Sequence, residues 1–298
     1  MKIYLKHTGE PVSEHQKMEV LAHRGVHLHW KRGLHDIFEG CEASHIYPLN
    51  HQYIENTIES VSAAFSMGAT IVEIDIRQTK DSQLMVFHDR MLECRTNGTG
   101  KVIERNLDYL KQLDIGYGYT PDNGKTYPLR GSGVGMMPTL GELLSAFPRG
   151  KFLIDHKDGT MDSAEILASI LQSLTDEQRR LISYWGPERC LKHIQRELPE
   201  FDRMFPNRRQ VRSWVLKYLI SFGSWDFPPE AEGLIIAMPH SVGRFFWGWP
   251  HRLVRKIHAA GGEFYLLVNS EEEVESARRL AVDGIVTDHI ERIGTHFQ

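Results

Sequence analysis

Short runs rich in valine, isoleucine and leucine alternate with segments of helical periodicity along most of the chain. This order predicts parallel strands joined by crossover helices. Apolar residues recur at three- and four-residue spacing within 143–147, 166–171 and 274–281, as helices packed on a sheet require. The nine candidate strands are EVLAHRG (19–25), TIVEIDIRQT (70–79), LMVFHD (84–89), KFLIDHK (151–157), RLISYW (180–185), DRMFP (202–206), GLIIAMP (233–239), EFYLLVN (263–269) and DGIVTD (283–288).

The gap between the second and third runs decides the topology. Only residues 80–83 separate them, whereas a parallel crossover needs a dozen or more residues, so the third run must return as an antiparallel hairpin. The remaining eight strands in 298 residues predict an α/β fold, a single (β/α)8 TIM barrel with its catalytic groups at the carboxyl ends of the strands. We expect residues 26–54 and 95–137, which break the alternation, to be insertions on that catalytic face.

Composition narrows the class of protein. Thirty-five basic against 39 acidic residues leave a formal charge of -4, which gives no reason to expect nucleic-acid binding. The polar N-terminal residues do not resemble a signal peptide, and no apolar run is long enough to span a membrane. Cys41, Cys94 and Cys190 lie far apart, so we expect free thiols in a reducing compartment and a cytoplasmic enzyme. The oligomeric state is not indicated.

Titratable residues gather late in several of the expected strands. Residues two apart in a strand point to the same side, so Glu73 and Asp75 project together, as do Asp155 and Lys157. Three carboxylates in a narrow barrel mouth repel one another, and a bound divalent cation relieves that repulsion. Oxygen ligands suit Mg2+, Ca2+ or Mn2+. The full set, in chain order, is His23, Arg24, Glu73, Asp75, His88, Asp89, Asp155 and Lys157.

The cationic and imidazole groups of this set match phosphodiester chemistry. Arg24 and Lys157 can bind the non-bridging oxygens of a phosphate, and His23 and His88 can exchange protons with attacking and leaving oxygens. An anionic diester repels nucleophiles until a metal ion and cationic side chains offset its charge. The residues themselves therefore indicate metal-assisted cleavage of a phosphodiester.

The motifs also resemble a known family. AHRG, IENTIESVSAAFSMGATIVEIDIRQTKDSQLMVFHD, TNGTGKV, MPTLGELLSAFP, FLIDHK and DGIVTD are similar, in order and spacing, to the signature of the glycerophosphodiester phosphodiesterases. The resemblance implies a hydrolase that uses one divalent cation to split a glycerophosphodiester into glycerol 3-phosphate and an alcohol. By that likeness His23 and His88 are the catalytic acid/base pair. The expected metal ligands are Glu73, Asp75, Asp155 and Glu55, and the expected substrate-binding residues are Arg24, Lys157 and Asn56.

The chain departs from the family pattern in three places. Asp155 stands where the family usually has glutamate, which shortens one metal ligand. Residues 266–269 read Leu-Leu-Val-Asn instead of the common Trp-Thr-Val-Asn, which removes an aromatic wall from the pocket. The gap between His23 and Glu55 is unusually long, and this insertion could form a lid or an extra subsite. It carries five histidines, namely His27, His29, His35, His45 and His51.

Several assignments stay open at this level. Glu55 could instead cap the following helix. The insertion histidines are expected to be solvated loop residues, with His27 and His29 as possible exceptions, and residues 36–42 to be ordinary loop. RFFWGWPHR (244–252) fits either a lipid-contacting loop, which would make peripheral lipid a partner, or a rim helix packed by its aromatics.

Two other functions compete with the glycerophosphodiesterase. One is a lysophospholipase D-like activity on a monoacyl phospholipid, for which the missing tryptophan and the aromatic loop are the motives. The other is a barrel that binds a phosphorylated ligand without cleaving it. In the leading hypothesis, a histidine deprotonates water or the neighbouring glycerol hydroxyl, and the sequence does not separate these two mechanisms.

Overall fold

A computed structural model describes residues 4–5, 11–12, 18–31, 41–199, 201, 206, 208–280 and 282–297. Most of its strands coincide with the runs expected from the sequence. They are β1 (Tyr4–Leu5), β2 (Pro11–Val12), β3 (Glu19–Ala22), β4 (Ile71–Gln78), β5 (Leu84–Val86), β6 (Phe152–His156), β7 (Ile182–Trp185), β8 (Ile235–Pro239), β9 (Glu263–Leu267) and β10 (Gly284–Thr287).

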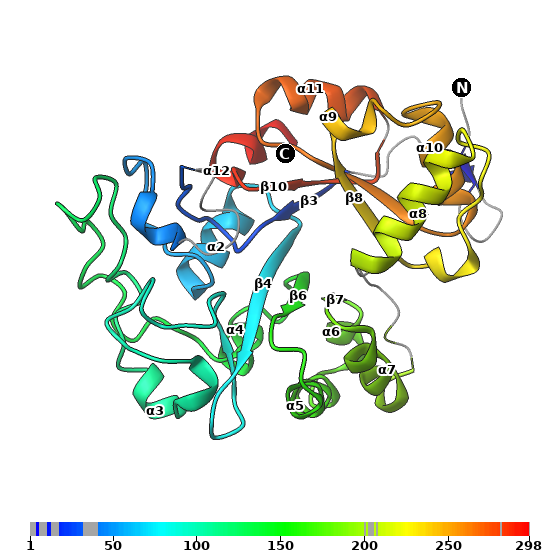
Figure 1. Cartoon of the computed structure of the whole chain (residues 1–298). Coiled ribbons are helices and arrows are strands. Elements are labelled where there is room, and N and C mark those ends of the chain that lie inside the picture. The colour runs from blue at the N-terminus through cyan, green and yellow to red at the C-terminus, as the bar shows by residue number, and fades with distance from the viewer. Residues whose placement is uncertain are drawn as a thin grey trace.

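Seven of these strands form one parallel sheet in the order β7-β6-β4-β3-β10-β9-β8 (Figure 1). Every neighbouring pair along this path is parallel. β5 pairs antiparallel with β4, with Ile76 opposite Val86. The strand expected at 202–206 falls mainly outside the described residues, and within the described part β7 and β8 are the ends of the path. The predicted α/β class with a curled parallel sheet is confirmed.

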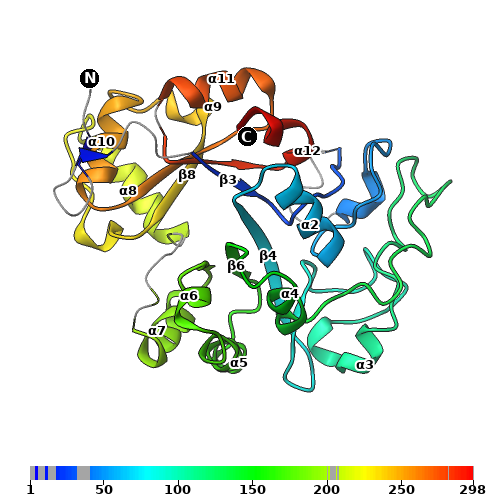
Figure 2. The ribbon, with the colours of Figure 1, turned by 180° about the vertical axis from the view of Figure 1, so that it is seen from behind.

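Helices surround this sheet because their apolar stripes need a surface to cover. Thr57, Thr139 and Thr160 cap the starts of α2, α4 and α5 by accepting a backbone N–H through the side-chain oxygen. Figure 2 shows α2 and α4 beside β4. The helices are α2 (Ile58–Ser66), α3 (Leu107–Leu110), α4 (Leu140–Ala146), α5 (Met161–Gln172), α6 (Asp176–Arg179), α7 (Glu188–Glu197), α8 (Arg208–Ile220), α9 (His240–Gly243), α10 (His251–Ala259), α11 (Glu271–Leu280) and α12 (Ile290–Ile293), with 3-10 turns η1 (Glu42–His45), η2 (Val102–Glu104), η3 (Pro229–Ala231) and η4 (Gly294–Phe297).

Apolar side chains fill the inside of the curled sheet. Leu21, Ile71, Leu153, Ile235 and Tyr265 form a buried cluster that is separate from the larger core between the sheet and the helices. Because residues two apart on a strand share a side, the next inward positions toward the carboxyl ends lie directly beyond this cluster. Those positions are the ones available to a functional site.

The described parts of residues 26–54 and 95–137, the two segments that interrupt the alternation of strands and helices, pack against each other. Leu28 and Ile46 from the first segment share a hydrophobic cluster with Ile115 and Leu129 from the second and with Phe87 beyond β5. In Figure 1 the two segments lie together at the left, on the far side of the sheet from α8 and α10. These two segments therefore build a small core of their own at one side of the sheet.

A disulfide joins Cys41 to Cys94. The expectation of free thiols is wrong for these two residues, because packing of the insertions brings their Cα atoms within 5.3 Å across 53 positions of sequence. Cys190 is free and buried, as expected. Since disulfides are rare in reducing compartments, cysteine usage no longer supports a cytoplasmic location. Among the described residues, every helix is too short or too polar to span a bilayer.

Candidate active site

Three carboxylates converge at the carboxyl end of the sheet. Glu73 and Asp75 alternate with the helix-facing residues of β4, and Asp155 on β6 stands directly opposite Asp75 in the strand register. All three are buried, and each offers an oxygen within 4.8 Å of the others. The structure therefore brings together three of the four predicted metal ligands.

Burial and mutual repulsion govern the ionisation of this cluster. Burial, followed by the charge of Asp75, raises the pKa of Glu73 to about 8. Burial also raises the pKa of Asp155, against the opposing charge of Lys157. Burial acts in the same direction on Asp75, but there the charges of Arg24 and Lys157 prevail and hold its pKa below the usual range. The cluster thus carries more potential negative charge than the neighbouring side chains neutralise.

Two oxygens of this cluster fit an additional cation. Glu73 Oε1 is buried and has no hydrogen-bond partner among the described residues. Asp75 Oδ1 is also buried, and its one close contact is an ion pair with Lys157 Nζ at 2.8 Å. Buried carboxylate oxygens are costly without a partner, and an all-oxygen donor set suits a hard divalent ion. The residues present therefore fit a cation such as Mg2+, Ca2+ or Mn2+.

His23 extends beyond β3 and lies next to the cluster. Its Nε2 is 3.9 Å from Glu73 Oε2, and its Nδ1 is hydrogen bonded to Asp288 Oδ1 at 2.8 Å. Burial lowers the pKa of His23, but the carboxylates of Glu73 and Asp288 outweigh it and raise the value above normal. Asn269 supports Asp288 by donating its side-chain N–H to Oδ2 at 3.1 Å and by accepting the Asp288 backbone N–H. An oriented imidazole with one free nitrogen facing the acids is suited to proton transfer.

His88 follows β5 and has its own carboxylate partner. Its Nδ1 lies 2.7 Å from Asp89 Oδ1, and Arg77 Nε donates to its backbone carbonyl. Burial lowers the pKa of His88 below its ordinary value, with Asp89 acting in the opposite direction. The two histidines are thus held in the same manner, each by a carboxylate on Nδ1, but their pKa values are displaced in opposite directions.

Arg24 turns back into the site because its backbone is left-handed, with φ of 55°. Its N–H donates to Glu73 Oε2 at 2.9 Å, and its guanidinium lies 3.4 Å from Asp75 Oδ2. Gly25, also at positive φ, permits this turn, since a Cβ there would lie 2.4 Å from Ser60 Oγ. Lys157 Nζ sits between Asp75 and Asp155. Both predicted phosphate-binding cations therefore border the acid cluster.

Asn56 and Glu55 are both buried and bound by other side chains. Asn56 donates its amide N–H to Asp75 Oδ2 at 2.7 Å and accepts the Asp75 backbone N–H, so it positions that carboxylate. Glu55 lies outside the three-acid cluster, and its oxygens are bound by Arg95 and by the Tyr119 hydroxyl. Glu55 does not cap α2 either, because Thr57 does.

An ionic network behind Arg24 was not expected from the sequence. Glu42, placed in ordinary loop by the sequence argument, accepts a hydrogen bond from Arg24 at 2.8 Å and contacts Arg95. Arg95 is buried and also binds Asp89 at 2.9 Å. No periodicity marks these residues, since they meet only when the two insertions pack together. Asp288 did carry a signal, because it ends the expected strand 283–288; the structure adds that β10 pairs with β3 and places Thr287 beside Ala22.

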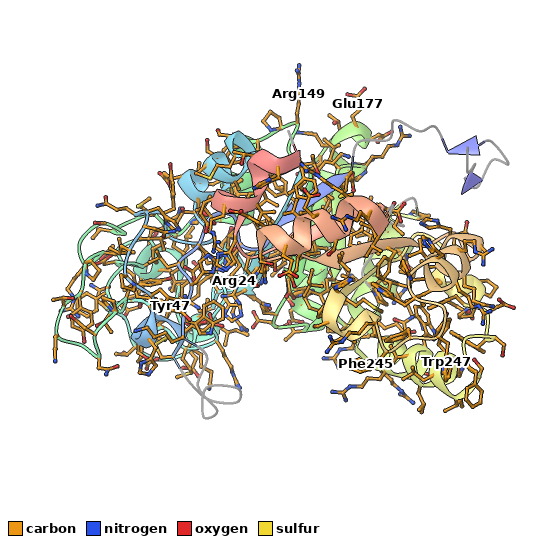
Figure 3. All side chains as sticks on the ribbon, turned by 90° about the horizontal axis from the view of Figure 1, so that it is seen from above. Arg24, Tyr47, Arg149, Glu177, Phe245 and Trp247 are labelled. Atoms are coloured by element: carbon orange, nitrogen blue, oxygen red, sulfur yellow. A yellow bond between two sulfur atoms is a disulfide. The ribbon has the colours of Figure 1, made fainter. Side chains whose placement is uncertain are left out.

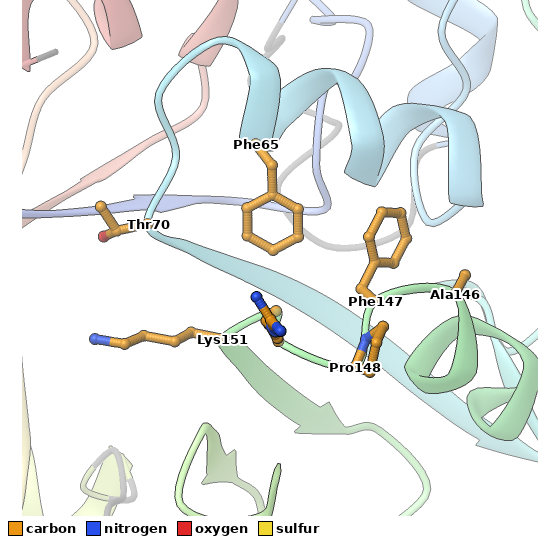
Figure 4. Close-up of a pocket in the computed structure, with 8 residues that line it drawn as sticks. Phe65, Thr70, Ala146, Phe147, Pro148 and Lys151 are labelled. Atoms are coloured by element: carbon orange, nitrogen blue, oxygen red, sulfur yellow. The ribbon is translucent and has the colours of Figure 1, made fainter. Parts of the chain in front are cut away.

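A separate pocket lies at the opposite end of the strands. Phe65, Phe147, Arg149 and Lys151 are among its lining residues, just before β6 (Figure 4). Figure 3 shows Arg149 at the upper edge of the molecule and Arg24 well below it. This pocket has no acidic or imidazole group in its lining, so it is not a candidate for the chemistry described above.

The protein is an α/β barrel that carries acidic, imidazole and cationic groups at the carboxyl ends of its strands. Residues 40–292 match the model of the Glycerophosphoryl diester phosphodiesterase family. The chain therefore belongs to this family, and its fold is the TIM barrel predicted from the sequence.

Individual relatives span most of the chain. A glycerophosphodiester phosphodiesterase of Caldanaerobacter subterraneus subsp. tengcongensis is 26% identical over 80% of this chain and 90% of its own length. Lysophospholipase D GDPD1 of Homo sapiens is 24% identical over 79% of each chain. The structure of an Oleispira antarctica phosphodiesterase in complex with the product sn-glycerol-3-phosphate matches with a TM-score of 0.60 and 20% identity, covering 93% of this chain and 96% of that one.

Proposed function

We propose that the protein hydrolyses glycerophosphodiesters to glycerol 3-phosphate and an alcohol with the help of one divalent cation. The observation that carries this proposal is the convergence of Glu73, Asp75 and Asp155, with unpartnered buried oxygen, between two oriented histidines. The names of the relatives and the product held by the Oleispira enzyme support the same substrate class.

Each group has a role that its surroundings allow. Glu73, Asp75 and Asp155 would hold the cation, which when bound would polarise the phosphate and offset its charge. Arg24 and Lys157 bind non-bridging phosphate oxygens. His23 and His88, each fixed through Nδ1, exchange protons at Nε2 with the attacking and leaving oxygens. The nucleophile is water or the neighbouring glycerol hydroxyl.

Two predicted residues take supporting roles in this proposal. Asn56 orients Asp75 through both ends of its amide, rather than binding substrate directly. Glu55, with its oxygens committed to Arg95 and Tyr119, holds the ionic network behind Arg24 rather than the cation.

An activity panel tests the leading proposal. The purified chain is incubated with glycerophosphocholine and related soluble diesters in the presence of Mg2+, Ca2+ or Mn2+, and glycerol 3-phosphate is quantified. We expect product with at least one ion and none after chelation. Absence of product with every ion and diester would instead favour a barrel that only binds a phosphorylated ligand.

A second candidate, cleavage of a monoacyl phospholipid, is favoured by an exposed apolar patch. The side chains of Phe245 and Trp247 are 70% and 50% exposed, and Phe222 packs on Trp247 at a ring distance of 5.3 Å. Both labelled residues lie at the edge of Figure 3 opposite to Arg149, on the end where the strands terminate. Leu216 and Ile220 of α8 and Val242 of α9 are further exposed apolar residues of this part of the chain.

The charges around the apolar patch favour a lipid surface as its partner. Residues 206–225 and 233–262 contain no aspartate or glutamate, whereas they include Arg212, Lys217, Arg244 and Arg252. Apolar side chains ringed by cations are typical of peripheral contact with phospholipid. Comparing kcat/KM on glycerophosphocholine and on its monoacyl analogue decides between the candidates, and a strong preference for the soluble diester would end the second.

A further inference from the structure

A second group of metal-ligating side chains lies beside the candidate active site. His29 belongs to the first insertion, His289 follows β10, and Glu291 lies in α12. His29 Nε2 is 3.4 Å from Glu291 Oε1, and His289 Nδ1 is 3.2 Å from the same oxygen. The two imidazole rings stack with centroids 3.5 Å apart. Three ligand atoms from segments about 260 positions apart therefore lie within 4.8 Å of one another.

Hydrogen bonding within the described residues leaves this group incompletely satisfied. His29 Nε2 and Glu291 Oε2 are buried and have no hydrogen-bond partner there. The two side chains are only 15% and 10% exposed. Burial raises the pKa of Glu291, but contacts with His289 and His29 hold it below its usual value, so the carboxylate is ionised at neutral pH. A buried carboxylate whose second oxygen has no partner is costly unless something binds it.

The two distances to the Glu291 oxygen fit a tetrahedral ion. Bonds of about 2.0–2.2 Å to nitrogen and oxygen give ligand separations of roughly 3.3–3.6 Å around a tetrahedral centre. The imidazole nitrogens lie 3.2 and 3.4 Å from Glu291 Oε1, and the two stacked rings would turn apart to direct both lone pairs at one ion. Two imidazoles and one carboxylate suit a borderline ion such as Zn2+, whereas the all-oxygen cluster of Glu73, Asp75 and Asp155 suits a hard ion. The two clusters therefore select different metals.

We propose that His29, His289 and Glu291 form a second metal site that binds Zn2+ or a similar first-row transition ion. The site would tie the first insertion to α12 at the barrel mouth. The proposed site adjoins the candidate active site at two points of the sequence. His23 lies six residues before His29, and Asp288, the hydrogen-bond partner of His23, directly precedes His289. A bound ion would therefore stiffen both halves of the His23–Asp288 hydrogen bond.

The test is built so that it does not depend on the proposed catalytic function. The full chain carries Glu73→Gln and Asp75→Asn, which remove the oxygen cluster, and binding of Zn2+ is measured by calorimetry and by metal analysis after dialysis. We expect one tightly bound Zn2+ per chain in this background. Glu291→Gln and His289→Ala, added separately, should each weaken Zn2+ binding at least about 100-fold, because each removes a direct ligand.

A matched control and a stability readout complete the design. His45→Ala changes an exposed histidine of the same insertion and should leave Zn2+ affinity unchanged. Zn2+ should raise the Tm of the background protein and not that of the added Glu291→Gln variant, whose Tm without metal checks that it is folded. Failure of the background protein to bind Zn2+, or equal affinity in the Glu291→Gln and His289→Ala variants, would overturn the proposal.

Discussion

The two sides of the barrel mouth handle charge in opposite ways. On the insertion side, Arg95 is buried among the carboxylates of Glu42, Glu55 and Asp89, so its charge is balanced inside the protein. On the side of α8 and the turn at 244–250, apolar rings and cations face outward. One side of the mouth is an internally neutralised network, and the other is an open surface.

This difference in charge arrangement determines what each side of the mouth can do. A buried ion network fixes positions, because removing one partner leaves an uncompensated charge. Exposed apolar and cationic side chains contribute favourable free energy only when another surface covers them. The insertion side is therefore suited to hold Arg24 and the reacting groups in place, and the α8 side is suited to meet lipid.

Metal removal should have the largest effect on turnover, and the effect should not depend on which side of the mouth contacts the substrate. We expect chelation to lower turnover at least about a thousandfold on soluble and monoacyl substrates alike, because the cation offsets the charge of the common phosphate. Turnover is measured before and after chelation and again after Mg2+, Ca2+ or Mn2+ is restored. Undiminished turnover in metal-free protein would contradict the assignment of Glu73, Asp75 and Asp155.

Loss of either proposed acid/base histidine should come next. We expect His23→Ala and His88→Ala each to lower kcat at least about 100-fold, because a proton transfer to or from a reacting oxygen is lost. The His45→Ala variant serves as the control, since His45 is an exposed insertion residue. Near-normal rates in both site variants would refute their roles.

Substitution of a buried cation on the insertion side should cost far more stability than substitution of an exposed one on the α8 side. Arg95→Met leaves three carboxylates without their shared partner and should lower the free energy of unfolding by about 3–5 kcal/mol. Arg244→Met removes an exposed charge and should change it by less than about 0.5 kcal/mol. Urea denaturation of the two variants measures both values, and equal losses would erase the contrast between the two sides.

The sequence predicts best the positions of site residues that are fixed by the two-residue periodicity of a strand. The positions of Glu73 and Asp75 follow from alternation along one strand, and Asp155 follows from the same rule on its neighbour. Asp288 was missed although it ends a recognised strand, because its importance depends on which strand pairs with β3. The barrel class follows from the count and order of the runs, which is a property of the whole chain.

The contacts formed by the two irregular segments could not be predicted from the sequence, for a physical reason. Arg95 and Glu42 are 53 positions apart, as are Cys41 and Cys94, and both pairs form only because two irregular segments share a hydrophobic cluster. Irregular segments have no period that fixes which side chain points inward. The same packing carries Glu55 away from the cluster of Glu73, Asp75 and Asp155 and into the ionic network.

The smallest expected effect is also the one that separates the two candidate substrates. Phe245→Ser combined with Trp247→Ser removes the most exposed rings of the apolar patch, and we expect about a tenfold loss of binding to phosphatidylcholine vesicles. Cleavage of a vesicle-bound monoacyl lipid should fall by the same factor, while cleavage of soluble glycerophosphocholine should not change. Cosedimentation and the two rates are measured on the same preparation.

The insertion side supplies the matched control for this experiment. Tyr47 is 53% exposed and lies away from Phe245 and Trp247 in Figure 3, so Tyr47→Ser removes a comparable ring from the opposite side of the mouth. If the apolar patch meets lipid, only the paired Phe245 and Trp247 change lowers vesicle binding. An equal loss with Tyr47→Ser would mean that exposed aromatic area in general, rather than the cation-ringed α8 side, drives the contact with lipid.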